Sequence, residues 1–334
     1  MLGKFDGTSI RLGAEGLPLY EQQGFGRPEQ AGLRLAPVEA LYLLQKEKIT
    51  VEGHNFESLV AAFSQKPNFL RTYLVYRDIR ERGYAVQPGP QDLRVFRRGE
   101  RPGEGRSRYF IRILSERDLV EFDNVTADTT TTGFMRKQNL IAVVDDENEL
   151  TYYEVREQPL PAHTPEPPSG TVTGVLSGVS VIARAVAGSW LETGWFGKRL
   201  DTEHVILSPV EVQYLLKKEW LHIDPGNPVE AGTYLDSVVK EDPEVREKAV
   251  VYTDLRDRGL VPRTGYKFGH HFRVYITGKT HSDLLVHAVP MGVVMPMSSI
   301  SRSVRLAHSV KKKMLFGRIQ DTGIRYIEFA RVKL

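Results

Sequence analysis

The stretch of sequence that decides the fold is TGYKFGHHFRVYITGKTHSDLLVHAV, residues 264–289, followed by SRSVRLAHSVKKKM, residues 301–314. HFRVYI alternates polar and apolar residues, LLVHAV is an apolar run, and the TGKT between them is short enough for a hairpin. The sequence therefore predicts two antiparallel strands that bring Tyr275 and His281 to the two sides of one turn.

The second segment predicts a helix. Its apolar residues recur three and four positions apart, which gives one buried face: Ile300, Val304, Ala307 and Val310. Its cationic residues share the same spacing and predict a different face of that helix: Arg305, His308 and Lys312.

A hairpin that offers Tyr and His beside a helix that offers Lys is a candidate phosphate-ester site. Cleavage of RNA by its own 2′-hydroxyl needs a base, an acid for the leaving 5′-oxygen, and a cation for the charged phosphorane. Each residue also has an ordinary structural interpretation. A tyrosine that ends a strand is usually packed, and lysines at a helix end usually answer the helix dipole.

The motifs GYKFGHHFRVY, HSDLLVHAV and RLAHSVKKKM resemble the catalytic domain of the archaeal tRNA-splicing endonucleases. The resemblance implies that Tyr275, His281 and Lys312 form a catalytic triad of general base, general acid and phosphorane stabiliser. It implies a reaction that needs neither metal nor cofactor and leaves a 2′,3′-cyclic phosphate and a 5′-hydroxyl. The expected substrate is precursor tRNA, cut at a bulge-helix-bulge.

An internal repeat organises the whole chain. LRLAPVEALYLLQKEKI (33–49) matches VILSPVEVQYLLKKEWL (205–221), and YLVYRDIRERGYAV (73–86) matches VVYTDLRDRGLVP (250–262). In both copies a proline sits where a helix begins and a glycine where the next helix ends. The chain is therefore two tandem copies of one unit.

We expect a mixed α/β (α+β) fold in which each repeat has a small N-terminal α/β subdomain followed by a nuclease-like mixed-sheet subdomain. The expected domains are 1–68 and 69–157 for the first repeat, a Pro-rich linker at 158–172, and 173–242 and 243–334 for the second repeat.

The copies differ at the candidate site. The residues of the first copy that correspond to Tyr275, His281, Arg305 and Lys312 are Phe96, Arg106, Thr130 and Lys137. The first copy has lost the base and the acid, so we expect it to be catalytically inactive. The other interpretation is that neither copy was ever catalytic, since Phe for Tyr is a common exchange in apolar packing.

The first copy also carries an acidic turn between two apolar strands, made by Asp145, Asp146, Glu147 and Glu149. Such a turn is ordinarily just solvated. The family resemblance instead implies that this acidic tip docks into a basic pocket on the second repeat of a partner chain, which gives a twofold homodimer. It also implies two arginines that clamp a bulged base. Arg305 is our match for the first, and Arg325, or Arg331, for the second.

Composition agrees with a globular protein. The hydrophobic content of 41% and charged content of 26% are typical of that class. The net charge of +3 requires nucleic-acid affinity to come from clustered charge. The chain has no cysteine, which excludes disulfides and thiolate chemistry. It shows no membrane-spanning run and no signal-peptide core, so we expect a cytoplasmic protein with no membrane partner.

Two other functions stay open. A non-catalytic RNA-binding or scaffold subunit would bind RNA on the same fold without cutting it. A DNA nuclease would need paired carboxylates and a divalent metal, and no such pair stands near Tyr275 in the sequence.

Overall fold

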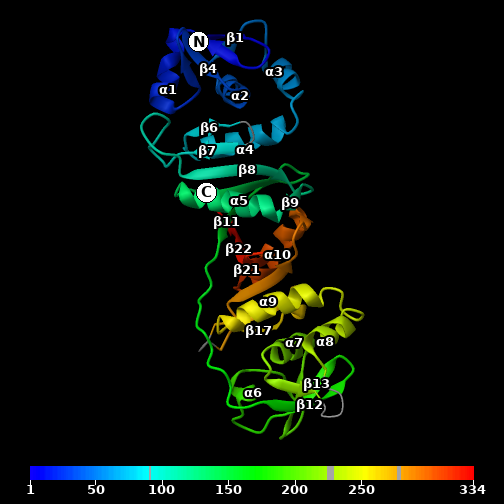
Figure 1. Cartoon of the computed structure of the whole chain (residues 1–334). Coiled ribbons are helices and arrows are strands. Elements are labelled where there is room, and N and C mark those ends of the chain that lie inside the picture. Colours follow the sequence, from blue (N-terminus) through cyan, green and yellow to red (C-terminus); the bar gives the residue numbers. More distant parts are fainter. Residues whose placement is uncertain (90–91, 224–228, 277–279) are drawn as a thin grey trace. The chain divides into compact units, whose positions relative to one another are not determined.

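The structure is a computed structural model that describes residues 1–89, 92–223, 229–276 and 280–334. It separates into two compact units (Figure 1). Unit 1 comprises Met1–Arg156, Val294–Arg302 and Phe329–Leu334, and unit 2 comprises Glu157–Val293 and Ser303–Glu328. Each unit contains a small sheet and a longer mixed sheet with helices. The predicted mixed α+β fold in two tandem copies is confirmed.

The small sheets have the same strand order in the two units, β3-β4-β2-β1-β5 in unit 1 and β14-β15-β13-β12-β16 in unit 2. β1 pairs antiparallel with β2 and parallel with β5, and β12 pairs in the same way with β13 and β16. The elements of unit 1 are β1 Leu2–Phe5, β2 Ile10–Leu12, η1 Ala14–Gly16, α1 Leu17–Gln23, β3 Arg27–Glu29, β4 Gly32–Leu35, α2 Pro37–Gln45, β5 Thr50–Val51 and α3 Phe56–Phe63. Those of unit 2 are β12 Val172–Ser177, β13 Ser180–Arg184, α6 Trp190–Thr193, β14 Lys198–Arg199, β15 His204–Leu207, α7 Pro209–Lys217, β16 Leu221–Ile223 and α8 Ala231–Val238.

The longer sheets also repeat. Their orders are β6-β7-β8-β10-β11 in unit 1 and β17-β18-β19-β21-β22 in unit 2. In each, the helix between the third and fourth strands of this order makes those two strands parallel. The elements of the first are α4 Phe69–Glu81, β6 Val86–Pro88, β7 Asp92–Val95, β8 Tyr109–Ser115, β9 Leu119–Glu121, α5 Phe122–Phe134, β10 Gln138–Val144 and β11 Leu150–Glu157. Those of the second repeat are α9 Val245–Asp257, β17 Val261–Thr264, η2 Tyr266–Phe268, β18 Phe272–Tyr275, β19 Leu284–Val289, β20 Val294–Pro296, α10 Met297–Ser309, β21 Lys313–Gln320 and β22 Gly323–Val332. Of these, β20 pairs with β9 in a separate sheet of two strands, and β20 and the first residues of α10, up to Arg302, belong to unit 1.

The repeated residues hold these elements in place. The two prolines occupy the first helical positions of α2 and α7, as predicted. The buried carboxylates of Glu39 and Glu211 accept hydrogen bonds from the amides of Gly26 (2.8 Å) and Gly197 (2.9 Å). Each glutamate also accepts from the amide just before its helix, at 2.8 Å. The glutamate of each copy therefore joins its helix to a neighbouring turn.

The glycine-ended helices are confirmed as well. Gly83 and Gly259 follow α4 and α9 with φ of 88° and 73°, the left-handed conformation that glycine adopts most easily. One turn earlier, Asp78 accepts a hydrogen bond from the hydroxyl of Tyr152 on β11 at 2.7 Å. The equivalent Asp254 accepts from a tyrosine of β22, also at 2.7 Å. The repeated aspartates therefore fasten a helix to a strand of the longer sheet.

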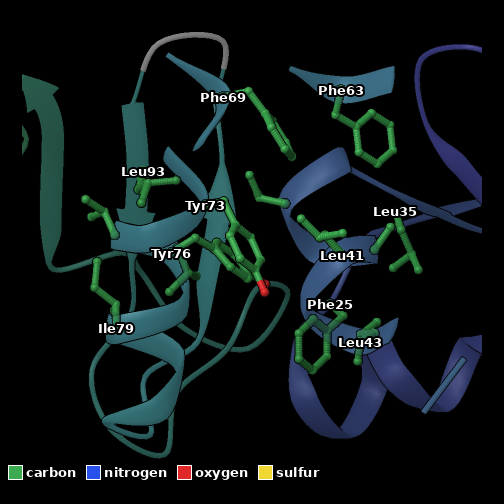
Figure 2. Close-up of a cluster of buried hydrophobic side chains, with 14 of the residues drawn as sticks. Phe25, Leu35, Leu41, Leu43, Phe63, Phe69, Tyr73, Tyr76, Ile79 and Leu93 are labelled. Carbon is green, nitrogen blue, oxygen red and sulfur yellow. The ribbon is translucent and has the colours of Figure 1, made fainter. Parts of the chain in front are cut away.

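In each unit one hydrophobic core joins the part that contains the small sheet to the part that contains the longer sheet. In unit 1 it joins residues of the small sheet and α2 to residues of α4 and the longer sheet. Figure 2 shows Tyr73 and Tyr76 of α4 between Leu93 of β7 and Leu41 of α2. Unit 2 has the same arrangement with its own core. Burial of these apolar side chains stabilises the two parts together, so they form one folded body.

None of the helices in the described ranges combines the length and the apolar character that crossing a membrane requires.

Candidate active site

Tyr275 is the last residue of β18 and pairs with Val261 on β17. Its ring is half-buried, and its centroid lies 5.5 Å from the ring of Trp195. The guanidinium carbon of Arg273 lies 5.7 Å from the centroid of the tyrosine ring. An aromatic ring and a cation therefore flank the tyrosine.

His281 is exposed and stands shortly before β19. The predicted antiparallel pairing of β18 with β19 is confirmed, with Phe272 opposite Val286. The end of β18 and the start of β19 consequently lie at the same edge of the sheet. The predicted hairpin turn falls on residues 277–279, which lie outside the described residues.

The predicted helix is confirmed as α10, and three of the four apolar positions are buried: Ile300, Val304 and Ala307. The predicted cationic face of this helix, Arg305, His308 and Lys312, was wrong for Lys312, because α10 ends at Ser309 and Lys312 lies beyond the helix.

The amide of Lys311 donates to the carbonyl of His308 (3.0 Å), and the amide of Lys312 donates to that of Ala307 (2.8 Å). This pattern ends a helix with a left-handed residue, here Lys311 with φ of 56°. The place is usually taken by glycine, so the sequence did not mark the end.

Lys312 instead leads directly into β21, which runs parallel to β19 with Lys313 opposite Leu284. Its ammonium group donates a hydrogen bond to the carbonyl of Ser282, the residue after His281. Tyr275 at the end of β18, His281 shortly before β19 and Lys312 just before β21 therefore lie at the same end of three neighbouring strands in the longer sheet of unit 2.

The strand registers align the two copies at these positions. In the first copy, the amide of Phe96 donates to the carbonyl of Ala85 (3.0 Å), which lies one residue before β6. In the second copy, Tyr275 pairs in the same way with Val261, the first residue of β17. The next pairs, Val86 with Val95 and Pro262 with Val274, then coincide. Phe96 is only 5% exposed and has no hydroxyl. The first copy thus has a packed ring where the second has a half-buried phenol.

The other two positions align as well. Gln138 pairs with Tyr109 in unit 1 as Lys313 pairs with Leu284 in unit 2. Arg106 of the first copy therefore stands at the position of His281, and Lys137 at that of Lys312.

The two arginines differ in their surroundings. Arg305 is exposed on α10. Arg325 on β22 forms an ion pair with Glu157, with 3.1 Å between Nε and Oε1. The neighbouring Tyr326 faces Gly317, five residues along β21 from Lys312, which corresponds to about 15–20 Å at the rise of a strand. Arg325 therefore stands toward the other end of the sheet, and Arg331 belongs to unit 1.

The acidic residues form a tight hairpin tip between β10 and β11. The carboxylate of Asp145 accepts hydrogen bonds from the amides of Glu147 (3.0 Å) and Glu149 (2.8 Å), which fixes the turn. Asp146 pairs with Arg117. Asp146, Glu147 and Glu149 are exposed. The tip presents negative charge from a rigid hairpin.

Three histidines of unit 2 form a cluster that the sequence did not predict. The ring of His271 stacks on that of His287 with centroids 4.1 Å apart, and its Nε2 lies 3.5 Å from a carboxylate oxygen of Glu244. Burial lowers the pKa of His270 and of His271 to about 4, and also lowers that of His287, so the cluster is uncharged at neutral pH. In the sequence only the adjacent pair His270 and His271 hinted at this cluster. The three rings are buried because segments that are distant in the chain pack around them.

These histidines line a cavity of about 900 Å³ between the small and longer sheets of unit 2. Its basic lining residues are Lys198, Lys248, Arg263 and Arg273. Lys248 already pairs with Asp242 and Glu244, whereas the exposed Lys198 stands at the small sheet. Among the described residues, no group of three or more acidic or histidine side chains is arranged to hold a metal ion.

Comparison with known families gives a consistent result. The family described as tRNA intron endonuclease, catalytic C-terminal domain, matches residues 69–152 and 245–326. The family described as tRNA intron endonuclease, N-terminal domain, matches residues 1–60 and 172–231. Each half of the chain thus matches both domains in the same order.

Curated relatives match along the whole length. A tRNA-splicing endonuclease of Methanococcoides burtonii is 38% identical over 336 residues, which covers 94% of each chain. One from Methanosarcina acetivorans is 35% identical over 353 residues and covers both chains fully. One from Natronomonas pharaonis is 32% identical over 351 residues and covers 99% of each.

The fold and the site define a duplicated α+β protein in which only the second copy keeps the tyrosine and the histidine at its sheet edge. The chain belongs to the tRNA intron endonuclease family.

Proposed function

We propose that the second repeat carries the active site of an endoribonuclease that excises introns from precursor tRNA. The observation that carries this proposal is that Tyr275, His281 and Lys312 lie at the same end of the neighbouring strands β18, β19 and β21 of unit 2. The substrate is inferred from the family, whose curated members here are named tRNA-splicing endonucleases.

The reaction is an attack of a ribose 2′-hydroxyl on the adjacent phosphate. Tyr275 takes the proton of that hydroxyl as its oxygen bonds to phosphorus, and His281 gives a proton to the 5′-oxygen as the P–O5′ bond breaks. The products are a 2′,3′-cyclic phosphate and a 5′-hydroxyl. Tyr275 and His281 supply both proton transfers and Lys312 supplies the positive charge, so the proposed mechanism is independent of metal.

Lys312 stabilises the pentavalent phosphorane. Its ammonium group is hydrogen-bonded to the carbonyl of Ser282, which fixes a positive charge close in the chain to His281. A fixed charge stabilises a developing anion without the cost of reorganisation. Lys137 occupies the same place in the first repeat, but there Phe96 has no proton to exchange.

The active form is proposed to be a homodimer. The acidic tip at Asp145–Glu149 of one chain docks into the basic cavity of unit 2 in its partner. The cavity supports this proposal, because its lining cations Lys198, Lys248, Arg263 and Arg273 outnumber its acids Glu211, Asp242 and Glu244, and opposite charges favour docking. Lys248 and Arg263 already pair with these acids, so Lys198 and Arg273 are the cations we expect the acidic tip to meet. A twofold dimer offers two active sites, one for each bulge of a bulge-helix-bulge RNA.

Arg305 is proposed to contact a bulged base, because it is exposed on the helix that leads to Lys312. RNA binding by Arg325 stays a prediction. It would require its ion pair with Glu157 to be exchanged for a contact with RNA.

The test is cleavage of a short bulge-helix-bulge RNA by the purified chain in excess EDTA, with chemical analysis of the new 3′ end. We expect cleavage that leaves a cyclic phosphate and is lost in His281→Ala. The matched control is Arg106→Ala in the first repeat, which should cleave normally. RNA binding without cleavage by the unaltered chain would contradict the proposal and favour a scaffold role.

A further inference from the structure

Trp195 holds an unusual backbone conformation beside Tyr275. It follows the short helix α6 with φ of 58°, in the left-handed region that a bulky side chain disfavours. The equivalent residue of the first repeat is Gly24, which ends α1 with φ of 68°. The same turn is therefore built with glycine in one copy and with tryptophan in the other.

The surroundings of the turn establish this equivalence. A phenylalanine follows in each copy, and its amide donates back into the helix, from Phe25 to the carbonyl of Leu19 six residues earlier (3.0 Å) and from Phe196 to that of Leu191 five residues earlier (2.7 Å). The glycine that follows in each copy has φ of 71° or 66° and donates its amide to the buried glutamate of α2 or α7. The left-handed residue changes from the smallest side chain to the largest, and the residue before it changes from Gln23 to Gly194.

Burial does not explain the tryptophan. Trp195 is 48% exposed, although most of an indole's stabilising effect comes from burial. An exposed ring on a strained backbone is the kind of outlier from which a functional role is inferred.

The turn is also rigid. The carbonyl of Trp195 accepts hydrogen bonds from the guanidinium groups of Arg256 (3.1 Å) and Arg263 (3.0 Å). Arg256 is itself buried, binds the carbonyl of Gly194 (2.8 Å) and lies 4.0 Å from the ring centroid of Phe196. The backbone of Trp195 is thus held in place before any ligand arrives, which lowers the entropic cost of binding.

The indole faces a cavity that reaches the catalytic edge. The cavity has a volume of about 560 Å³, and Trp195, Tyr275, Ile276 and Thr280 are among its lining residues. The rings of Trp195 and Tyr275 are inclined at 52°, so they are not stacked face to face. One indole face is therefore not used by the tyrosine.

We propose that Trp195 is a stacking platform for one unpaired nucleobase of the RNA strand that is cut at Tyr275. The inference rests on the proposed function. Stacking on an aromatic ring suits every base, so the platform positions the strand and does not read its sequence. The first repeat has glycine at this place and offers no platform.

Binding is measured first, in a His281→Ala background, so that the RNA stays intact. The probe is a bulge-helix-bulge RNA in which each bulge nucleotide in turn is replaced by an abasic one. We expect Trp195→Gly to raise Kd for the intact RNA about 5- to 150-fold, the range for loss of one stacked base. An abasic nucleotide at one position should weaken binding to the Trp195 protein and have no further effect on the Gly variant.

Two variants control for folding. Trp195→Phe keeps a ring and should retain most of the affinity, whereas Trp195→Gly reproduces the turn of the first repeat and should not lower the thermal unfolding midpoint. If Trp195→Gly binds intact RNA as the Trp protein does, or if it lowers binding of intact and abasic RNAs by the same factor, the platform is refuted.

Cleavage by the chain with His281 intact is measured separately. We expect Trp195→Gly to raise KM more than it lowers kcat. Failure of the unaltered chain to cut RNA would refute the proposed function, while the dependence of Kd on the abasic position would still decide the role of Trp195.

Discussion

The buried carboxyl of Glu39 should make the stability of the first repeat depend on pH. Burial raises the pKa of Glu39 to about 7, although two backbone amides favour its charged form. A carboxyl with a raised pKa in the folded state stabilises the fold fully at low pH. That stabilisation is lost as pH rises through about 7. Glu39→Gln cannot titrate, so its stability relative to the unaltered protein should increase with pH.

The magnitude follows from the pKa. The ordinary value is 4.5 and the folded value is about 7. Since one pKa unit corresponds to 1.36 kcal/mol, the free energy of unfolding should change by about 3 kcal/mol between pH 4 and pH 8, relative to the Gln variant. Glu39 is fully buried, so screening by solvent does not reduce this figure.

The assay is urea unfolding of the full chain at pH 4 to 8, in which unfolding is monitored by hydrogen exchange of the backbone amides of α2. Local exchange is needed because all three tryptophans lie in the second repeat, so their fluorescence reports unit 2. Glu211→Gln is the control. Its carboxylate also pairs with Arg263 at 3.2 Å, so its loss should destabilise α7 at neutral pH. A stability difference for Glu39→Gln that stays constant from pH 4 to 8, or falls as pH rises, would refute the reasoning.

Three further outcomes are expected. Ala36→Ser should raise the free energy of unfolding by about 1 kcal/mol and Ser208→Ala should lower it by about as much, measured by urea unfolding, because the Ser208 hydroxyl donates a hydrogen bond of 2.7 Å to the carboxylate of Glu211 in the first turn of α7; equal stabilities would contradict this. Lys312→Met should slow single-turnover RNA cleavage about 100- to 1000-fold, the range for loss of one charge stabiliser, and an unchanged rate would exclude the assigned role. Reversing charge with Glu147→Lys and Glu149→Lys should convert the dimer to monomer in sedimentation at 150 mM salt, whereas an unaffected dimer would show that the acidic tip does not dock.

Sequence alone predicted the elements that carry local signals. Proline marked the starts of α2 and α7, and glycine marked the ends of α4 and α9. The β-rich alternation and the apolar run around Tyr275 predicted the strand pair, because strand period and apolar runs are properties of neighbouring residues.

The features that were missed depend on backbone conformation or distant packing. Lys311 takes a left-handed conformation without being glycine, so the end of α10 before Lys312 had no sequence mark. The position of Trp195 beside Tyr275 depends on Arg256 and Arg263, which follow it by more than sixty residues in the chain. No local pattern contains such information.

The single core of each unit limits how chains of this kind can be recombined. A chimera that joined the small sheet of one repeat to the nuclease-like part of the other would place α2 against α9, or α7 against α4. The aromatic rings that meet there are equivalent in the two units, since Tyr42 contacts Phe25 and Tyr76 in unit 1 and Tyr214 contacts Phe196 and Tyr252 in unit 2. The mismatch in such a hybrid would come from aliphatic positions, such as the fully buried Ala40 of α2 and the equivalent, larger Val212 of α7. Because a packed core tolerates changes of volume poorly, we expect the hybrid to be less stable than either parent repeat.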